Sequence, residues 1–512
     1  MPDNCDSRRY TVISFAPVQG FIEKSRKLRD LYGASQILSY LSWKIVIAAK
    51  SKGLAVVSPA IGISDTSEMT NMDIVQGMPN RILILGDFSH NDAHQALTAG
   101  WKEVVMACRN WLRAHLQIED RGWVNSWTRW QIHAWEVFWG GGQTIESAMR
   151  DLETRKLRRA WTVPNWNGES SSLSGHDAIA HPDMDSLGVD EHQIKRFYQR
   201  LAEIIDPTGT ANDRAYINEN ERLSIPELIK RLVTYESIAK AIHPDLYAPT
   251  FREVLRKDDR SGATYWTGWF MGDGDRVGDH LKKLTDSASV TQFSQSLRAW
   301  GRQFQTDFDK QGKGRVIYAG GDDFLGVMYG DKKNPQLDGR VVITWLRELR
   351  ESWAQGNLGI TLSVGFVWAG HSVPQRDVLQ HCREAEKLAK KLGRDRVTIR
   401  VVFNNGQFVQ WTTPWPCLQW LNDYTDRDGS NNWSHIYSDL AQLKARHGIP
   451  PTTSNKIDDT IALELFGLYF GADKQKQLSQ ERGKITGSED GRAMIEWIDG
   501  MIRVGWQLCS NS

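Results

Sequence analysis

The chain has 512 residues, and at roughly 150 residues per domain this length allows about three or four domains. Lysine plus arginine (63) nearly balances aspartate plus glutamate (62). This balance excludes a protein that coats nucleic acid through one large excess of positive charge. Hydrophobic residues make up 40% of the chain and charged residues 24%, so the chain is too apolar to be disordered.

The sequence also indicates the cellular compartment in which the protein is expected. No stretch reaches the roughly 18–20 apolar residues that a membrane span needs, and the opening residues MPDNCDSRRY lack the apolar core of a secretory signal. The sequence contains no Cys-x-x-Cys pair among Cys5, Cys108, Cys382, Cys417 and Cys509. We therefore expect neither a disulfide framework nor a cysteine-rich zinc site, and we predict a cytoplasmic protein without a membrane partner.

The first part of the chain alternates between β and α patterns. Predicted elements are strands at 10–15, 54–58 and 81–85 and helices at 35–50 and 91–116. This order predicts a small α/β domain over residues 1–116. Residues 117–261 are mostly helical in pattern and include a polar loop at 165–186, so we predict a helical middle domain there.

The segment 262–405 has the clearest pattern. We predict strands at 264–271, 315–319, 324–329, 360–368 and 397–403 and helices at 290–308, 341–353 and 375–392. The first six of these elements follow the order βαββαβ, which is the ferredoxin-like arrangement. Residues 406–512 predict a C-terminal helical bundle. The expected fold class is therefore α+β.

Two acidic motifs in this segment predict a reactive site. Met271-Gly272-Asp273-Gly274-Asp275 follows the first predicted strand, and Gly320-Gly321-Asp322-Asp323 forms the turn between the second and third strands. In a βαββαβ sheet the crossover helix makes the first and second strands parallel, so the end of strand one and this turn share one edge. We therefore expect Asp273, Asp322 and Asp323 to converge.

Three adjacent carboxylates repel one another unless a cation lies among them. Carboxylate oxygens suit Mg²⁺ or Mn²⁺, which share their ligand shell with substrate phosphates. Gly320 and Gly321 would let the backbone approach a triphosphate, and the backbone at Gly274 would offer N–H donors to it. Each motif alone is more often only a turn, but their shared edge favours a nucleotidyl-transfer site.

Other side chains have competing interpretations. Lys387 and Lys390 lie in a basic stretch near the end of a predicted helix, where they either reach the triphosphate or only stabilise the helix C-terminus. His176 and Asp177 resemble a metal-phosphohydrolase dipeptide but are interpreted as a solvated loop. The tryptophans at 123, 127, 130, 135 and 139 recur at helical spacings and are interpreted as core rather than as a base-stacking platform.

Several separated motifs resemble one family, the large polymerase-like subunit of type III, especially III-B, CRISPR effector complexes. The matching segments are 15–22, 25–35, 78–81 (Met-Pro-Asn-Arg), 221–223, 228–231, the two acidic motifs, and Ser363-Val364-Gly365 with Glu386-Lys387-Leu388-Ala389-Lys390. At position 220 this chain has asparagine where the family often has glycine.

The resemblance implies two palm domains of which the second is active, separated by a helical insertion. It implies that ATP is the substrate and that the product is a cyclic oligoadenylate, made when guide RNA pairs with target RNA. On this basis Asp273 and Asp323 hold metal, Asp322 is essential beside them, and Asp275 and Ser363 belong to the nucleotide-binding set. The implied partners are a neighbouring repeat-associated RNA-binding subunit, backbone and small subunits, guide RNA and target RNA.

Two departures from the family pattern matter. Many relatives carry a His-Asp nuclease domain before the opening motif, which here begins within 20 residues of the start, so we expect a variant without that domain. Where relatives often have zinc-binding cysteines, this chain has Ser171, Ser172, Ser174 and later Ser224. Serine does not replace cysteine as a structural zinc ligand, so we expect hydrogen bonds and packing, not zinc, to hold that region.

Alternatives remain open from the sequence alone. The same metal site could join AMP to another acceptor, such as S-adenosylmethionine, or make a cyclic dinucleotide. The chain could also be a catalytically silent scaffold of the complex. The sequence does not indicate product ring size, metal preference, the activation mechanism, which basic residues contact RNA, or whether any nuclease activity remains.

Overall fold

Two compact units make up the chain in a computed structural model. The first unit comprises Met1–Glu253 with Leu281–Arg302, and the second comprises Val254–His280 with Gln303–Ser512. The structure describes residues 9–61, 77–118, 121–159, 166, 168–183, 190–207, 216–246, 254, 256–258, 261–284, 286–330, 334–450 and 457–510. We describe each unit by itself.

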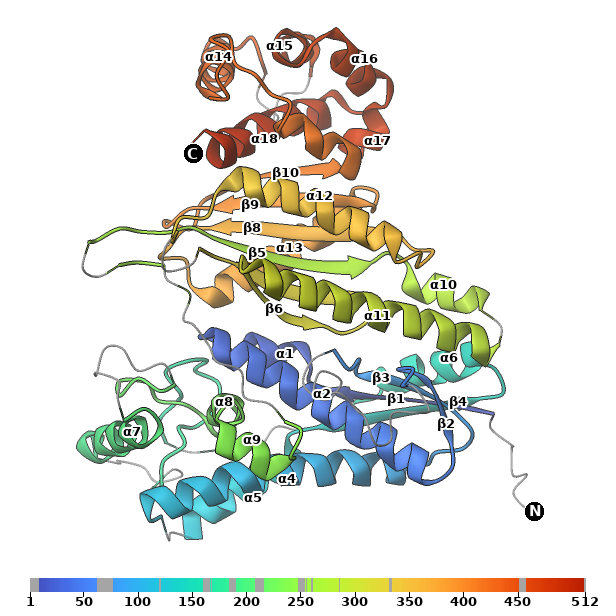
Figure 1. Cartoon of the computed structure of the whole chain (residues 1–512), viewed down its shortest axis with the longest axis vertical. Helices are drawn as coiled ribbons and strands as arrows, with labels where there is room; N and C mark the ends of the chain where they lie inside the picture. Colours follow the sequence, from blue (N-terminus) through green and yellow to red (C-terminus); the bar gives the residue numbers. More distant parts are fainter. Residues whose placement is uncertain are drawn as a thin grey trace. The chain divides into compact units, whose positions relative to one another are not determined.

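A four-stranded antiparallel sheet organises the first unit (Figure 1). Its strands are β1 (Tyr10–Ala16), β2 (Ala55–Ser58), β3 (Arg81–Leu85) and β4 (Glu136–Gly142). In space they are ordered β2-β3-β1-β4, with α2 (Leu28–Ser51) between β1 and β2 and α4 (His90–Leu116) between β3 and β4. This order and connectivity are ferredoxin-like, so the predicted palm architecture is confirmed for this sheet.

The predicted boundary at residue 116 is wrong for this sheet, because its fourth strand, β4, lies beyond it. Trp139 in β4 is the partner of Ile13 in β1. The strand is missed in the sequence because Trp135 just before it and Trp139 within it continue the helical tryptophan spacing of α5 (Arg121–His133), and because the strand ends in three glycines. Gly140 is needed there, since a Cβ atom would lie 2.4 Å from the Leu152 backbone nitrogen of α6 (Ile145–Lys156).

Both faces of the first sheet are covered. Because alternate residues of a strand face opposite sides, Ile13 and Phe15 pack into the core that includes α2 and α4, whereas Tyr10 and Val12 pack with residues of α6. Four of the five tryptophans noted above, at positions 123, 127, 135 and 139, are buried, and Trp130 packs against the same core. Their predicted role as core residues is confirmed.

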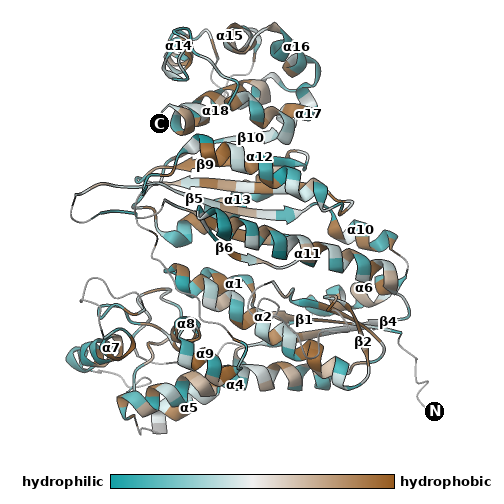
Figure 2. Cartoon of the chain, viewed as in Figure 1, coloured by the Kyte–Doolittle hydropathy of each residue, from teal (hydrophilic) through white to brown (hydrophobic). Residues whose placement is uncertain are grey.

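The first unit has four further described helices, of which the first lies between β1 and α2 in the chain and the other three come after β4. They are α1 (Gln19–Glu23), α7 (Glu191–Ile205), α8 (Ile225–Leu232) and α9 (Glu236–Ile242). Figure 2 shows the amphipathic character of α7, whose hydrophobic residues include the buried Ile194, Tyr198 and Leu201. The middle segment is therefore largely helical, as predicted, apart from β4.

A buried ion network joins the first half of this unit to its last part. Arg231 of α8 donates from Nε to Asp30 at 2.8 Å and from Nη1 to Glu221 at 2.5 Å, and Arg231 and Asp30 are 0% and 1% exposed. At Gly33 a Cβ atom would lie 1.8 Å from the carbonyl oxygen of Lys230, so only glycine lets α2 approach α8 this closely. The segments 25–35 and 228–231, which are far apart in the sequence, are therefore in direct contact in the structure.

A six-stranded sheet organises the second unit. Its strands are β5 (Thr267–Gly274), β6 (Gly314–Ala319), β7 (Asp323–Met328), β8 (Leu362–Ala369), β9 (Arg396–Val402) and β10 (Phe408–Pro414), ordered β10-β9-β8-β5-β7-β6. Strands β5 to β8 have the ferredoxin-like order, and β9 adds a parallel strand beside β8. The second palm is therefore confirmed, although β10 extends its sheet beyond the predicted limit at residue 405.

Helices cover both faces of the second sheet (Figure 1). They are the part of α11 (Ser287–Gln311) from residue 303 on, α12 (Gly339–Gln355) and α13 (Gln375–Lys391), whereas the short α10 (Val277–Lys283), which follows β5, buries none of its residues. Phe270 of β5 packs on Phe304 and Phe308 of α11 and on Trp345 of α12, with ring centroids 4.6–6.2 Å apart. Helix α13 packs on the opposite face, because its residues Cys382 and Glu386 lie against Gly365 of β8.

The C-terminal part of the second unit is helical after β10, as predicted. It contains a 3₁₀ helix (Trp415–Leu421), α14 (Ser434–Ala445), α15 (Thr460–Phe470), α16 (Ala472–Gln480), α17 (Arg482–Thr486) and α18 (Gly491–Cys509). Among all described helices, none combines the length and apolar character that crossing a bilayer requires. Cys108, Cys382, Cys417 and Cys509 are free and buried.

The Asp30–Arg231 pair predicts an acid-sensitive first unit. Burial alone would raise the pKa of Asp30, but the charge and hydrogen bonds of Arg231 lower it to about 2. Because this value lies below that of an exposed aspartate, about 3.9, the stabilisation is complete above about pH 4 and is lost as pH falls toward 2. Asp30→Asn should cost about 3 kcal/mol or more at pH 7 and should flatten the acid dependence of urea unfolding.

The matched control is Glu236→Gln, which removes an exposed pair with Lys240 of α9. Exposed pairs of this kind contribute about 0.5 kcal/mol or less. Equal losses for the two variants at pH 7 would contradict the structural role assigned to Asp30.

Candidate active site

Asp273 and Asp323 face each other at the end of two paired strands. They are Cα partners in the antiparallel pairing of β5 with β7, and directly opposed Cα atoms in such a pair lie about 4.5–5.5 Å apart. Strand β5 begins three residues later than predicted and continues through Gly274, so Asp273 lies within the strand rather than after it. The two distant motifs therefore converge as the topology predicted.

The turn between β6 and β7 places Asp322 beside the same strand end. Gly320 donates its backbone N–H to the carbonyl oxygen of Asp323 at 3.0 Å, and Gly321 has φ +129°, which favours glycine. Asp322 accepts the backbone N–H of Gly274 at 2.8 Å through its carbonyl oxygen. We name Asp273, Asp322 and Asp323 the acidic cluster.

The backbone N–H groups at Gly274 and Asp275 are bonded to other parts of the second unit. The N–H of Gly274 is already used by Asp322, and the next N–H, that of Asp275, donates to the carbonyl oxygen of Thr361 at 2.8 Å. These two N–H groups are therefore bonded within the protein, and a contact of the backbone around Gly274 with phosphate stays a prediction. Gly274 also serves close packing, since a Cβ atom would lie 2.7 Å from Ile360 and 3.1 Å from Asp322. A triphosphate contact of Gly320 and Gly321 stays a prediction.

Desolvation and repulsion between carboxylates both disfavour the charged form of the acidic cluster. Desolvation, followed by the negative charges of Asp322 and Asp273, raises the pKa of Asp323 to about 7. Asp323 is still accessible to solvent, and water screens part of this shift, so its direction carries the argument. Burial also raises the pKa of Asp273, against the attraction of Lys390. The charged forms of Asp273 and Asp323 are thus both disfavoured at this strand end.

Lys390 supplies one positive charge from α13. Its ammonium contacts Asp273 and also Glu386, the latter at 2.5 Å. Asp273, Met271 and Gly365 lie on one face of the sheet, because Met271 is paired with Gly365 and alternate residues share a face. Since α13 packs on that face at Gly365, Lys390 reaches the acidic cluster, whereas Lys387 is exposed.

Asp275 and Ser363 are buried, at 3% and 0% exposed, and their polar groups bond to one another. Their predicted contact with nucleotide stays a prediction. Asp275 accepts the hydroxyl of Ser363 at 2.7 Å through one oxygen. Its other oxygen accepts the Thr361 hydroxyl at 2.8 Å and the Asp395 N–H at 3.0 Å. Asp275 therefore ties β5 to β8 and to the residues that precede β9, and it positions the strand end that carries Asp273.

Two further residues were missed as part of the site. Glu386 is only 8% exposed and contacts the ammonium that pairs with Asp273. Desolvation and then the negative charge of Asp323 raise the pKa of Tyr318, which places its phenol near the cluster. Glu386 lies four residues before Lys390, so helical spacing could have predicted that pair. Nothing in the sequence around Tyr318 indicates its position.

The donor set fits a divalent cation. The acidic cluster offers carboxylate oxygens from two neighbouring strands and their turn, and such hard ligands suit Mg²⁺ or Mn²⁺. The raised pKa of Asp323 shows that the carboxylates repel one another without such an ion. Zinc is not favoured by this set, since its structural sites use cysteine and histidine.

Hydrogen bonds hold the serine-rich segment of the first unit. Ser171 donates its hydroxyl to Glu227 at 3.1 Å and accepts the N–H of Ser174 at 3.1 Å. Ser224 donates its N–H to the other oxygen of Glu227 at 2.8 Å. Nearby, Asp177 is 3% exposed and pairs with Lys24 at 3.0 Å. The interpretation of His176-Asp177 as solvated is therefore wrong for Asp177, which has a structural role.

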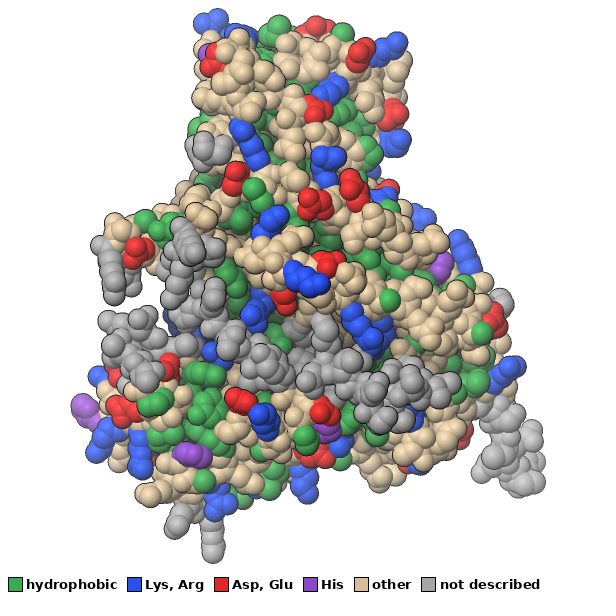
Figure 3. All heavy atoms as spheres, viewed as in Figure 1, with side chains coloured by type: hydrophobic (Ala, Val, Ile, Leu, Met, Phe, Trp, Pro, Cys, Tyr) green, Lys and Arg blue, Asp and Glu red, His purple; other side chains and the backbone are tan. Residues whose placement is uncertain are grey.

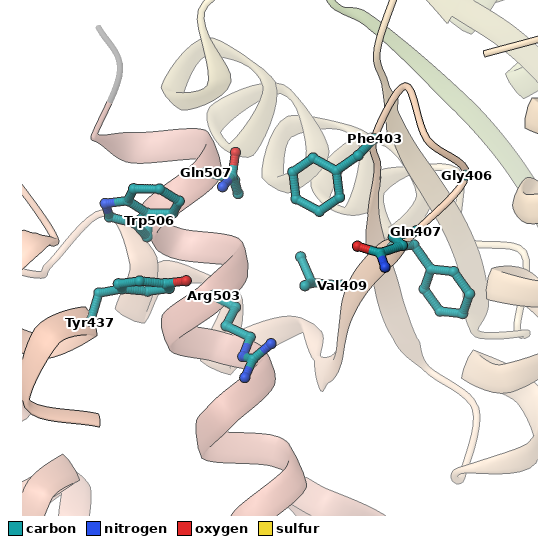
Figure 4. A pocket seen from close by; sticks show the side chains of 9 residues that line it. Phe403, Gly406, Gln407, Val409, Tyr437, Arg503, Trp506 and Gln507 are labelled. Atoms are coloured by element: carbon teal, nitrogen blue, oxygen red, sulfur yellow. The ribbon is translucent and has the colours of Figure 1, made fainter. Parts of the chain in front are cut away.

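Other features of the second unit lie apart from these residues. A cavity of about 420 Å³ lies between the β9–β10 turn and the helices α14 and α18, and the predicted site residues do not line it (Figure 4). Figure 4 shows Trp506 and Tyr437 stacked at its side, with ring centroids 4.4 Å apart. Asp426 and Asp428 gather with His435, but Asp426 already pairs with the His435 ring at 3.0 Å.

Charge on the visible surface is mixed. Figure 3 shows lysine and arginine side chains next to aspartate and glutamate over much of the face in view. This distribution agrees with the formal net charge of +1.

Comparisons with known proteins agree on one family. Residues 266–398 match the family model of the Cas10/Cmr2 second palm domain, and residues 10–106 match that of the N-terminal region of the CRISPR-associated protein Cmr2. These two matches confirm the resemblance predicted from the motifs. No curated protein matches the chain.

The chain is similar to several solved structures at low identity, and the first of the three described here supports the fold. The apo state of a type III-B Cmr-beta complex, solved by cryo-electron microscopy, contains a chain 12% identical with a TM-score of 0.53, and the match covers 99% of this chain and 78% of that one. An apo Csm1-Csm4 cassette matches at 14% identity and a TM-score of 0.47, over 99% and 71%. A Csm1-Csm4 cassette in complex with one ATP matches at 16% identity and a TM-score of 0.45, over 98% and 70%.

The positioning role of Asp275 gives a testable difference from the acidic cluster. Asp275→Ala leaves the hydroxyls of Thr361 and Ser363 and the Asp395 N–H without their buried acceptor, so it should cost about 2–4 kcal/mol in urea unfolding. Asp322→Ala, in a half-buried turn, should change the free energy of unfolding by less than about 1 kcal/mol. A fully stable Asp275→Ala that loses only nucleotide affinity would support the predicted nucleotide contact instead.

Proposed function

We propose that this chain, in which residues 10–106 match the Cmr2 N-terminal model and residues 266–398 match the Cas10/Cmr2 second palm model, is the palm-domain subunit of a type III CRISPR antiviral complex in the cytoplasm. Its proposed activity is to make cyclic oligoadenylate messengers from ATP, as a nucleotidyltransferase that is active when the guide RNA pairs with target RNA. The first palm has a structural role in this proposal, and the second palm is catalytic.

One observation carries the assignment of activity. Asp273 and Asp323 are directly opposed at the open end of β5 and β7, in the segment that matches the second palm. A structural turn would need neither this apposition nor the upward pKa shift of Asp323, which disfavours the charged pair. Such apposed charges are found where a site binds cations, so they favour catalysis over a silent scaffold.

The chemistry follows from this arrangement. The 3′-hydroxyl of one ATP would attack the α-phosphorus of the next, so that a phosphodiester bond forms and the bond to pyrophosphate breaks. Asp273 and Asp323 would hold Mg²⁺ or Mn²⁺, with Asp322 beside them, and a bound ion would activate the hydroxyl and neutralise the leaving group. Lys390 would balance negative charge at the cluster. Asp275 and Ser363 would keep the strand ends in register.

The proposed partners follow the family resemblance. They are the neighbouring repeat-associated RNA-binding subunit, the backbone and small subunits, guide RNA and target RNA. The match of residues 10–106 to the Cmr2 N-terminal model supports the first palm as part of such an assembly. The near-neutral charge of the chain suits a subunit that meets RNA largely through its partners.

The double variant Asp322→Ala, Asp323→Ala tests the activity. It removes ligands that act on the reacting phosphates, so product formation should fall by at least about 10³-fold. Neither side chain is part of the core, so assembly and melting temperature should stay close to those of the wild type. The measurement is mass spectrometry of products after incubation of the purified complex with ATP and Mg²⁺ or Mn²⁺, with and without target RNA.

The product spectrum decides among the activities. Cyclic oligoadenylates formed only with matching target RNA support the proposal. An AMP adduct formed only when S-adenosylmethionine is supplied, or a cyclic dinucleotide, would replace the product but keep the site. No consumption of ATP by a wild-type complex that binds guide and target RNA would establish the scaffold function instead.

A further inference from the structure

Lys390 occupies an oxygen that a metal ion would use. Its ammonium contacts Oδ2 of Asp273, and the same ammonium lies 2.5 Å from Oε1 of Glu386. Glu386 is four residues earlier on α13, so the two side chains lie on one side of that helix. Lys390 is therefore held between a carboxylate of the acidic cluster and a carboxylate outside it.

Helix α13 lies directly on the sheet at this position. A Cβ atom at Gly365 would lie 2.4 Å from the carbonyl oxygen of Cys382 and 2.5 Å from the nitrogen of Glu386, so the backbones of β8 and α13 are in close contact. We therefore expect the flexible Lys390 side chain, with its four-carbon stem, to rearrange at the cluster while the helix backbone stays in place.

Resting on the function proposed above, we propose that Lys390 is an internal counter-ion that competes with the divalent metal for Asp273 and transfers to the triphosphate when nucleotide binds. A divalent ion bound at Oδ2 of Asp273 must displace the ammonium from that oxygen, because two cations cannot share one carboxylate oxygen at close range without strong repulsion. Glu386 retains the displaced ammonium close to the site.

This exchange couples metal to nucleotide. Without nucleotide, the displaced Lys390 has lost one of its two carboxylate contacts, so metal binding is weakened. With nucleotide, the phosphates offer the ammonium a new anionic partner, and the penalty disappears. Metal and nucleotide should therefore bind cooperatively, and each should raise the affinity for the other by the same factor. The affinity of the site for metal is therefore lower before nucleotide binds than after it binds.

Mn²⁺ binding to the full-length chain tests the competition directly. Electron paramagnetic resonance of free Mn²⁺ gives the dissociation constant with and without an ATP analogue that has a methylene bridge between the α- and β-phosphates. Lys390→Met should bind Mn²⁺ alone at least about fivefold more tightly than the wild type, because the competitor is gone. The analogue should then tighten Mn²⁺ binding by a factor at least about fivefold smaller than in the wild type.

Lys391→Met is the matched control. It removes the same charge from the next residue of α13, which is exposed and outside the contacts of Asp273. Its Mn²⁺ affinity should stay within about twofold of the wild type. Unchanged or weaker Mn²⁺ binding by Lys390→Met overturns the proposal, as does equal tightening by both variants. Lys390→Gln repeats the test if Lys390→Met melts at a lower temperature.

Glu386→Gln tests the retention of the ammonium. At saturating Mn²⁺ it should weaken binding of the analogue by at least about threefold, because Lys390 is no longer held near the phosphates. Glu384→Gln, on the same helix but paired with Arg400 at 2.7 Å, should leave that affinity unchanged. Equal affinities of Glu386→Gln and the wild type overturn the role of Glu386.

The outcome also separates this inference from the proposed function. If Asp323→Asn abolishes Mn²⁺ binding while Lys390→Met does not strengthen it, the counter-ion role fails and the metal site stands. If the wild type binds no Mn²⁺ even with the analogue, the proposed function itself fails.

Discussion

Repulsion between carboxylates at the end of a paired strand is the constraint on which the rest of the second unit depends. The β5–β7 register places Asp273 opposite Asp323, and the tight turn brings Asp322 to the same edge. This arrangement is unfavourable without a cation, as the raised pKa of Asp323 shows. The fold therefore has to hold the strand ends together rigidly, and the site has to offer a place where positive charge is bound strongly.

Close packing supplies that rigidity. Cβ atoms at Gly272 and Gly326 would each lie 2.1 Å from a phenylalanine ring of the neighbouring strand, Phe324 and Phe270, so glycine makes room for the aromatic layer beneath α11 and α12. On the other face, Gly365 lets α13 lie on β8 and bring Lys390 to Asp273. Asp275, itself buried, fastens the strand end through three hydrogen bonds. The close packing at Gly365 positions Lys390, and the hydrogen bonds of Asp275 position the strand end that carries Asp273.

The sequence was sufficient for whatever depends on element order and spacing. Alternating strands and helices predicted a first α/β domain and the βαββαβ order of the second palm, while the family resemblance implied that the first domain is also a palm. The parallel direction of two strands in a βαββαβ unit predicted that Asp273 and Asp323 meet. The sequence was not sufficient where the conformation or burial of a residue depends on packing against another part of the fold. Strand β4 has a helical tryptophan spacing, and only the space beside α6 explains Gly140. The roles of Asp275 and Ser363 depend on burial, which the polar residue types themselves do not indicate.

The central claim is that the opposed aspartates bind a divalent ion which the substrate triphosphate shares. The most direct measurement is a crystal structure of the chain with Mn²⁺ and the methylene-bridged ATP analogue, with the ion located by anomalous scattering. Our account predicts an anomalous peak bonded to carboxylate oxygens of both Asp273 and Asp323 and to the triphosphate. Analogue bound elsewhere, or bound at this edge with no metal between the two carboxylates, would contradict it.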